Sequence, residues 1–498
     1  MADFDIAIIG GGINGTGIAR DAAGRGLRVL LVEQNDLASG TSSASSKLIH
    51  GGLRYLEHAA FRLVREALAE REVLLRMAPH VIRPMRFVLP PSPGPRSALL
   101  LRLGLFIYDW LGSRKILPAT RTIDLTHNAV GVPLKRSYRF AFEYSDCWVD
   151  DSRLVALNAM DAAEHGASIR TRTRLTRAER SDEWKLVLSD HGRRDTATAR
   201  VLVNAAGPWA GQVAETVLRV PLAEPLRLVK GSHIVVRKRF DHGSGYLFQP
   251  DDKRIVFALP FAREFTLIGT TDENFVGDVN SPAPTPAEVA YLCQAANVYF
   301  RESVSPDELV WSFAGVRSLH DDGSKKPEDI TRDYALALDE RFGEAPLLTV
   351  YGGKITTHRR LAEAAMERIG HFFMTQPPWT KDSTLPGGDM EFNGIEVKIS
   401  EFRQRWPFLT EPHARRLTLA YGTRAEKILG PAKTMDDLGI CFGSDLTAAE
   451  VRYLMAHEWA QTDEDVLWRR SKLGLQIGAE GRAMLAQFMA NEGAPAAA

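Results

Sequence analysis

The chain has 498 residues and carries 62 Lys and Arg against 62 Asp and Glu, so its formal net charge is zero. That length is too great for one hydrophobic core and predicts two or three domains. The absence of net positive charge argues against a dedicated nucleic-acid binder. The three cysteines are widely separated, which excludes a Cys-x-x-Cys dithiol and favours a reducing compartment. We expect neither a signal peptide nor a membrane-spanning helix, because the first strand begins at once and no run reaches about 18 apolar residues.

Residues 5–33 form the most informative segment. They contain an apolar strand, the motif Gly10-x-Gly12-x-x-Gly15, a helix of small residues and a second strand that ends at Glu33. In such a unit the first glycine permits the tight turn, the second lets a pyrophosphate approach the helix N-terminus, and the third lets the helix pack on the strand. The acid is placed to accept hydrogen bonds from an adenosine ribose. The segment predicts dinucleotide binding, and the alternative is an ordinary βαβ crossover.

Residues 39–55 follow this unit and are rich in small hydroxyls. Serine and glycine runs are often solvated linkers, but this one continues into an apolar, arginine-containing stretch without a charged break. Small hydroxyls can pair with phosphates and with a flavin ring without blocking them. His50, Arg54 and Tyr55 would then project beside the ring. Taken singly, such a histidine is more often a packing residue and such an arginine a surface cation.

The next segments alternate helix and strand patterns. Amphipathic spacing predicts a helix over 61–77, and five prolines over 84–95 predict a loop. Residues 173–203 predict a β-meander whose last strand runs into Gly207 and Trp209. Glycine there offers a second place where backbone can meet a cofactor.

One apolar segment has two readings. Residues 98–111 are dominated by Leu, Phe, Ile and Trp and are followed by Arg114 and Lys115, but they are too short to span a bilayer. They predict either a helix that lies in a membrane interface or a helix buried at a domain contact. Apolar periodicity does not distinguish the two.

The second half of the chain changes character along its length. Residues 228–275 are rich in strand patterns, and a proline-rich break precedes a predicted helix over 287–300. After Pro377-Pro378 the pattern becomes helical, which predicts a separate α-helical domain. Within it, Thr447-Ala-Ala-Glu450 reads as a capping box.

A third glycine motif lies near residue 350. Residues 347–358 read as a strand, a double glycine and a helix start that includes Lys354. The free N–H groups of a helix start carry partial positive charge, which suits the pyrimidine edge of a reduced flavin. Two arginines, Arg317 and Arg332, lie in nearby strand patterns. Arginine presents a planar fork that matches phosphate or carboxylate, although an exposed arginine is the common alternative.

Six motifs occur in order along nearly the whole chain: Gly10–Gly17, Thr41–Glu57, Phe142–Asp151, Lys230–Val236, Ile268–Asp272 and Tyr351–Thr357. Together they resemble the FAD-dependent glycerol-3-phosphate dehydrogenases of the membrane-associated, respiratory type. Segments 457–459 and 465–470 resemble that family's helical C-terminal domain. One departure follows Arg317, where the family more often has proline at 318 and a residue other than histidine at 320.

The resemblance implies an α/β fold with three domains. A Rossmann-like FAD-binding domain of the glutathione-reductase/D-amino-acid-oxidase type would comprise 1–80, 145–225 and 325–385. A β-sheet substrate domain would comprise 81–144 and 226–324, and a C-terminal α-helical domain would comprise 386–498. The implied reaction is oxidation of sn-glycerol 3-phosphate to dihydroxyacetone phosphate by FAD, with electrons passing to ubiquinone or menaquinone. A homodimer on the cytoplasmic face of the inner membrane is implied as well, with no metal and no nucleic acid.

The resemblance also implies roles for particular residues. The catalytic residues would be His50, Arg317 and Lys354, and the substrate contacts Arg54, Tyr55, Thr270, Arg317 and Arg332. The FAD contacts would be Gly10, Gly12, Ile13, Asn14, Gly15, Glu33, Thr41, Ser42, Ser45, Lys47, Leu48, His50, Gly207, Trp209, Gly353, Lys354 and Thr356. The reaction needs a base for the hydroxyl proton while the C2 hydride passes to the flavin N5. Either His50 or Lys354 can be that base, and a lysine would need a depressed pKa.

Three other functions fit part of the pattern. An oxidase that passes electrons from glycerol 3-phosphate to oxygen would share almost every motif. An amine, amino-acid or hydroxy-acid oxidase fits less well, because several candidate arginines suit a dianion better than one carboxylate. A non-catalytic, flavin-bound membrane adaptor is the third. The lack of a second Gly-x-Gly-x-x-Gly argues against NAD(P)H as an electron partner.

Overall fold

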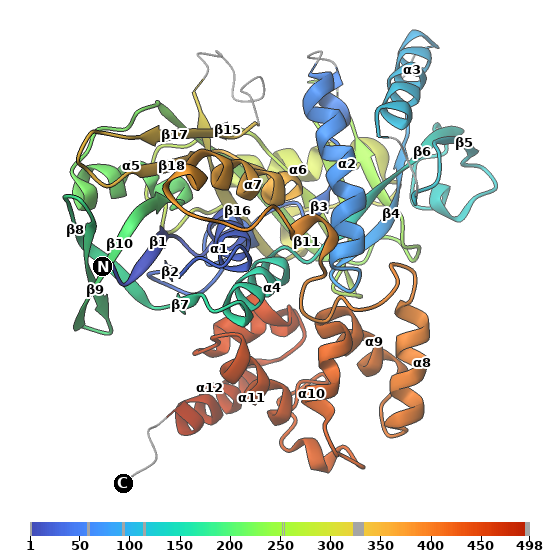
Figure 1. Ribbon diagram of the computed structural model, residues 1–498. Coiled ribbons are helices and arrows are strands. Elements are labelled where there is room, and N and C mark those ends of the chain that lie inside the picture. The colour runs from blue at the N-terminus through green and yellow to red at the C-terminus, as the bar shows by residue number, and fades with distance from the viewer. Residues whose placement is uncertain are drawn as a thin grey trace.

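The computed structural model describes residues 2–56, 60–91, 95–112, 116–250, 252, 254–321 and 333–493, and the side chains of Arg54 and residues 95–97 are not described. The described chain forms two β-sheets with helices packed on them, and a group of C-terminal helices lies against this body (Figure 1). Within the described residues, no helix is both long enough and apolar enough to cross a membrane.

The first sheet has eight strands and is parallel at its centre. Its order is β17 (Ala335–Asp339), β18 (Leu347–Tyr351), β10 (Arg193–Asn204), β1 (Phe4–Ile9), β2 (Val29–Val32) and β7 (Ser168–Arg170). Strands β8 (Thr173–Arg180) and β9 (Trp184–Asp190) extend it from β10 and, with β10, confirm the predicted meander. Helix α1 (Ile13–Gly24) packs against both α4 (Asp151–Glu164) and α7 (His358–Ile369).

The parallel register decides where the glycine motifs meet. Strand β1 pairs in parallel with β10, and β10 pairs in parallel with β18. Their carboxyl ends therefore lie at one edge of the sheet, and Gly10, Gly207 and Gly352 follow those three ends closely. Ligands of open α/β sheets bind at this edge.

The second sheet has ten strands and is mostly antiparallel. Its order is β15 (Glu273–Asn274), β11 (Leu226–Arg237), β14 (Phe265–Gly269), β13 (Val256–Phe261), β12 (Gly245–Phe248), β4 (Ile82–Leu89), β6 (Phe140–Val149) and β3 (Leu48–Ile49), with β16 (Leu309–His320) on β11 and β5 (Arg121–Asp124) on β6. Helix α6 (Pro286–Tyr299) contacts β11 to β14, and α2 (Phe61–Met77) contacts β4, β6 and α3 (Pro95–Leu111). Strand β3 comes from the range predicted for the cofactor domain but joins this sheet.

The predicted loop over 84–95 is wrong in its first half. Residues 82–89 form strand β4, which pairs along its whole length with β6. The proline at 84 is tolerated because β12 pairs with β4 only at Phe87 and Val88, so no neighbour on that side needs the missing N–H at 84. The predicted helices over 61–77 and 287–300 are confirmed as α2 and α6, the latter displaced by one residue.

The C-terminal region is helical, as the sequence predicted, with α8 (Ile395–Arg405), α9 (Glu411–Tyr421), α10 (Ala425–Leu429), α11 (Ala448–His457) and α12 (Ala479–Gly493). The capping box is only half formed. The Thr447 side chain accepts from the Glu450 N–H, but the Glu450 carboxylate pairs instead with Arg416 and accepts from the Tyr421 hydroxyl. The buried charge of Arg416 outcompetes the N-cap N–H for this carboxylate.

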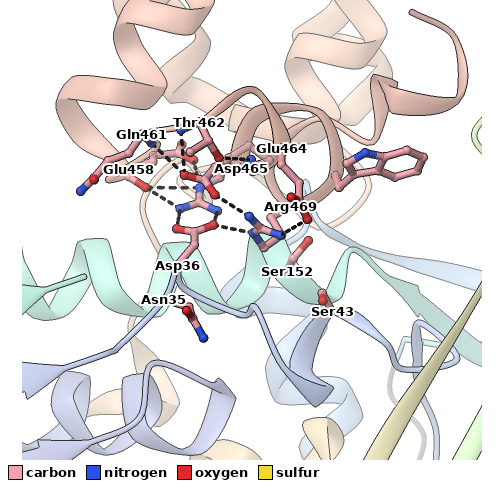
Figure 2. A network of polar contacts seen from close by, with 12 residues as sticks. Asn35, Asp36, Ser43, Ser152, Glu458, Gln461, Thr462, Glu464, Asp465 and Arg469 are labelled. Atoms are coloured by element: carbon pink, nitrogen blue, oxygen red, sulfur yellow. Dashed lines mark hydrogen bonds and ion pairs between the residues drawn. The ribbon is translucent and has the colours of Figure 1, made fainter. Parts of the chain in front are cut away.

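A buried ionic network attaches this helical region to the edge of the first sheet at which the parallel strands end (Figure 2). Asp36 pairs with Arg469 at 2.6 Å and with Arg470 at 2.8 Å, and both Asp36 and Arg470 are fully buried. Arg172 pairs with Asp465 at 2.7 Å and donates its N–H to the Asn35 carbonyl. The segment after Glu33 is therefore held by the charges of Arg469 and Arg470 and by the backbone N–H of Arg172.

Candidate active site

A cavity of about 520 Å³ opens where the carboxyl ends of β1, β10 and β18 face the second sheet. Its walls bring together the turn after β1, the hydroxyl-rich segment, the double glycine after β18 and residues of β12, β13 and β16. The predicted site residues that line it are Gly10, Gly12, Ile13, Asn14, Glu33, Thr41, Ser42, Ser45, Leu48, His50, Tyr55, Gly207, Trp209, Thr270, Arg317, Gly353, Lys354 and Thr356.

The glycine turn shows three different constraints. Gly10 has φ +111°, and a Cβ there would lie 2.6 Å from the Ala205 carbonyl oxygen. A Cβ on Gly15 would lie 1.9 Å from the Gly10 carbonyl oxygen, so Gly15 serves close helix packing and does not line the cavity. A Cβ on Gly12 would meet only the Ser42 hydroxyl, at 3.1 Å. Gly12 is thus the glycine of the motif that faces open cavity.

The N-terminus of α1 points into this space. The Ile13 N–H donates to the Ser42 hydroxyl at 3.0 Å, so a small, movable acceptor occupies a position that suits a phosphate oxygen. The Asn14 amide donates to the Gly352 carbonyl at 3.0 Å. That bond ties the first glycine motif to the third.

Glu33 lies at the end of β2, as the motif requires. Its carboxylate accepts from the Gly11 N–H and from the Asn35 N–H, each at 2.8 Å. Burial raises the pKa of Glu33, and the two backbone donors only partly oppose that rise. The carboxyl group is fixed by backbone on one side and lines the cavity on the other.

The hydroxyl-rich segment is held from behind by a buried ion pair. Lys47 does not line the cavity: it is buried, adopts φ +59° and pairs with Asp151 at 2.8 Å. Asp151 also accepts from the Ser45 hydroxyl at 2.8 Å. Burial opposes ionisation of Asp151, but the charges of Lys47 and Lys472 outweigh it and lower the pKa of Asp151. Lys47 therefore shapes the segment that faces the cofactor space.

His50, Lys354 and Tyr55 lie together in the cavity and are its candidate reactive side chains. Burial, with the charges of Lys354 and Arg71, lowers the pKa of His50 to about 3, so its imidazole is neutral at pH 7. The Lys354 ammonium lies 3.7 Å from the centroid of the Tyr55 ring, which is a cation–π contact. A neutral imidazole and a cation thus share this end of the site.

The opposite wall carries Arg317 on β16. Its guanidinium pairs with Asp272 and lies 3.4 Å from the Thr270 hydroxyl, and its side chain is 28% exposed toward the cavity. The Asp272 carboxylate fixes the plane of the Arg317 guanidinium. Arg332 lies outside the described residues, and so do Arg114 and Lys115.

The sequence did not single out several lining residues. Phe257 packs its ring edge-on to His50, with ring centroids 6.3 Å apart. Leu247, Arg254 and Asp272 also line the cavity. Strand alternation could have marked Leu247 and Phe257 as inward-facing, but only the fold shows that this interior is the site.

Comparison with known proteins places the chain in a family. Residues 5–359 match the family model described as FAD dependent oxidoreductase. The chain belongs to the FAD-dependent oxidoreductase family. Residues 378–492 match the model for the C-terminal domain of alpha-glycerophosphate oxidase. The three-domain division given above stays a prediction.

Several relatives are similar over nearly their full length. The chain is 50% identical to a glycerol-3-phosphate dehydrogenase of Pseudomonas aeruginosa, over 98% of this chain and 95% of that protein. It is also 50% identical to a D-erythritol 1-phosphate dehydrogenase of Brucella abortus and 48% identical to an aerobic glycerol-3-phosphate dehydrogenase of Escherichia coli, in both cases over 98% of each chain. Among solved structures, a glycerol-3-phosphate dehydrogenase of Bacillus halodurans complexed with FAD matches with a TM-score of 0.77 and 26% identity, over 98% of this chain and 90% of that one.

The cavity of this FAD-dependent oxidoreductase suits its cofactor. The side-chain-free face of Gly12 and the N-terminus of α1 would hold the pyrophosphate, and Glu33 would hold the adenosine ribose. The hydroxyl-rich segment and the backbone at Gly353 would border the flavin ring. Gly353 has φ +93°, and a Cβ there would lie 3.0 Å from the Asn14 amide nitrogen, so only glycine keeps the two motifs this close.

Proposed function

We propose that this FAD-dependent enzyme oxidises sn-glycerol 3-phosphate to dihydroxyacetone phosphate and passes the electrons to a membrane quinone, ubiquinone or menaquinone. The observation that carries the proposal is the pairing, in one cavity, of neutral His50 with the cations Lys354 and Arg317. A secondary alcohol with a phosphate dianion on the neighbouring carbon needs a proton acceptor for the hydroxyl and cations for the phosphate. The names of the P. aeruginosa and E. coli relatives support the same substrate.

The chain's own residues divide the chemistry between them. Arg317, together with Arg54 and Arg332, would grip the phosphate, whose binding energy then orients the reacting carbon. His50 would take the hydroxyl proton as the C2 hydride leaves, and the C2–O bond becomes a carbonyl. Bound FAD supplies the hydride acceptor. Lys354 fits a cationic role better than that of the base, because its ammonium contacts the Tyr55 ring face.

The direct test of this function is an anaerobic titration. Addition of glycerol 3-phosphate to the yellow protein should bleach the flavin absorbance, and addition of quinone should restore it. Glycine and simple 2-hydroxy acids should leave the colour unchanged. Persistence of the oxidised spectrum in glycerol 3-phosphate would exclude the proposed substrate and favour a non-catalytic role. Rapid peroxide formation in air without quinone would favour an oxidase.

A second substrate is favoured by one comparison. The B. abortus relative named D-erythritol 1-phosphate dehydrogenase is as similar to this chain as the P. aeruginosa enzyme. Erythritol phosphate is longer by one hydroxylated carbon, so both substrates present a phosphate and a secondary alcohol. Steady-state assays with glycerol 3-phosphate and with D-erythritol 1-phosphate separate the two substrates by the ratio of their kcat/KM values.

Replacement of Arg317 by Lys tests the phosphate clamp. Lysine keeps the charge but loses the planar fork, so we expect kcat/KM for glycerol 3-phosphate to fall by about tenfold or more, on the order of 1.4 kcal/mol. Arg332→Lys is expected to behave in the same way. Steady-state assays on glycerol 3-phosphate and on plain glycerol measure the effect. Equal losses on both would show that Arg317 serves structure or the chemical step and not phosphate recognition.

Helix α3 supports the proposed membrane contact. Figure 1 shows α3 standing out from the body beside the upper end of α2. Its outer face exposes large apolar side chains, with 71% of Leu100, 59% of Phe106 and 76% of Trp110 accessible. An exposed apolar face of this size favours an interfacial helix over a domain-contact helix. We propose that this face seats the enzyme peripherally on the cytoplasmic leaflet, where it would meet quinone.

A homodimer stays a prediction from family resemblance.

Combined replacement of Phe106 and Trp110 by Ser should weaken binding of the enzyme to the bilayer. We expect weaker co-sedimentation with anionic vesicles and slower quinone-linked turnover, because both side chains lie on the exposed face. Turnover with a soluble dye should persist, because neither residue lines the cavity.

The matched control for this variant is Phe342→Ser together with Met374→Ser, two fully exposed apolar side chains outside α3. The control should bind vesicles and use quinone like the wild type. If Phe106→Ser/Trp110→Ser keeps both vesicle binding and quinone turnover, α3 is not the membrane contact.

A further inference from the structure

The inner face of α3 reaches the active-site segment through Tyr108. Leu105 is fully buried and Tyr108 is 2% exposed, in contrast to the outer face of the same helix. The Tyr108 hydroxyl accepts the Gly51 N–H at 2.8 Å and lies 2.8 and 2.9 Å from the two carboxylate oxygens of Asp146, to which it donates. Gly51 follows His50 directly in the chain.

The acceptor of this contact is itself fixed. Asp146 lies in β6 and pairs with Arg71 of α2 at 2.6 Å, and both side chains are buried. Arg71 also donates to the Ser145 carbonyl at 2.8 Å. Because a hydroxyl has one proton, its donation to Asp146 orients the lone pairs of Tyr108 toward the Gly51 N–H. The hydrogen bonds therefore run in one direction, from the Gly51 N–H to the Tyr108 hydroxyl and from that hydroxyl to the Asp146 carboxylate.

His50 is consequently held through its backbone from two sides. Its own N–H donates to the Thr356 hydroxyl at 3.3 Å, on the side of the third glycine motif. The next N–H, that of Gly51, is held by Tyr108 on the side of α3. Gly51 is buried, so water cannot replace a lost partner there. Gly52, which has φ +76°, follows at once and gives the backbone freedom to shift when that bond is lost.

We propose that Tyr108 is a positioning residue for His50. Helix α3 would then help to hold the active-site backbone in place. The proposal rests on the proposed role of His50 as the base. Tyr108 touches neither the cavity nor the reacting atoms; it sets where the imidazole stands relative to the substrate hydroxyl. The helix that carries the exposed apolar face is thereby joined to the residue that removes the proton.

The test is Tyr108→Phe in the full-length holoenzyme. The ring keeps its packing, but the Gly51 N–H loses its 2.8 Å acceptor and keeps only its contact with the Asp146 carboxylate, which itself loses a donor. We expect the rate constant for anaerobic flavin reduction by glycerol 3-phosphate to fall on the order of tenfold, because small misplacements of reacting groups are costly. FAD content and the dissociation constant for glycerol 3-phosphate should stay within about twofold, since neither ligand touches the hydroxyl.

Tyr421→Phe is the matched control. The Tyr421 hydroxyl donates at 2.7 Å to Glu450, a buried carboxylate paired with Arg416, and it lies in the C-terminal helices away from the cavity. The control should lose comparable thermal stability but reduce its flavin at the wild-type rate. Wild-type reduction by Tyr108→Phe, or equal slowing in both variants, would overturn the proposal.

A second measurement separates this proposal from the proposed function. Amide hydrogen exchange over residues 48–52 should rise in Tyr108→Phe and not in Tyr421→Phe, whatever the substrate. If glycerol 3-phosphate fails to reduce even the wild-type flavin, the proposed function fails. The exchange result then tests only whether Tyr108 holds the backbone next to His50. Unchanged protection of the Gly51 amide in Tyr108→Phe would overturn that proposal.

Discussion

Replacement of Gly12 by Val is expected to give folded protein that contains no FAD and has no activity. The backbone at Gly12 has φ −83°, a region open to any residue, and a Cβ there would meet only the Ser42 hydroxyl. The valine side chain would instead project into the space between the N-terminus of α1 and the cavity. A pyrophosphate must approach the backbone at this point, so its site would be filled while the protein's own packing adjusts only at the Ser42 hydroxyl.

The measurement compares flavin absorbance with protein absorbance and follows folding by circular dichroism. Gly15→Val provides the contrast, because a Cβ there would clash with the Gly10 carbonyl at 1.9 Å and should impair folding itself. The two glycines of one motif therefore separate cofactor binding from packing. A yellow, fully occupied Gly12→Val protein would contradict the assignment of the pyrophosphate site.

Replacement of His50 by Asn is expected to slow anaerobic flavin reduction by about 100-fold or more, the usual contribution of a positioned general base. Burial and the charges of Lys354 and Arg71 lower the pKa of His50 to about 3, so the wild-type imidazole is unprotonated at neutral pH. Asparagine keeps a polar group of similar size but cannot take the proton. The dissociation constant for glycerol 3-phosphate should change far less than the reduction rate constant.

His80→Asn is the matched control for this variant. His80 is also buried, with a pKa lowered to about 3 by burial and by Arg153, but it does not line the cavity. The control should reduce its flavin at the wild-type rate. A fast His50→Asn enzyme combined with an inactive Lys354→Met enzyme would transfer the role of base to Lys354.

The sequence by itself determined the local elements. The strand, glycine turn and helix from β1 to β2 follow from an apolar run and three glycines at fixed spacing, which act within about 30 residues. Helix α2 and the β8 to β10 meander follow from periods of 3.6 and 2. These predictions hold because each depends on contacts between near neighbours in the chain. The predicted loop through β4 failed because proline patterns do not show which side of a strand lacks a partner.

Only the tertiary structure decided how the motifs combine. Parallel pairing of β1, β10 and β18 brings glycine motifs some 340 residues apart to one edge, where Asn14 bonds to Gly352. Lys47, a predicted cofactor contact, is buried beside Asp151 behind the hydroxyl-rich segment. The 98–111 segment shows the same dependence on the fold, because one face of α3 is exposed while Tyr108 on the other face is buried against Asp146. Exposure, pairing and charge neutralisation depend on residues distant in the chain, and a local pattern cannot specify them.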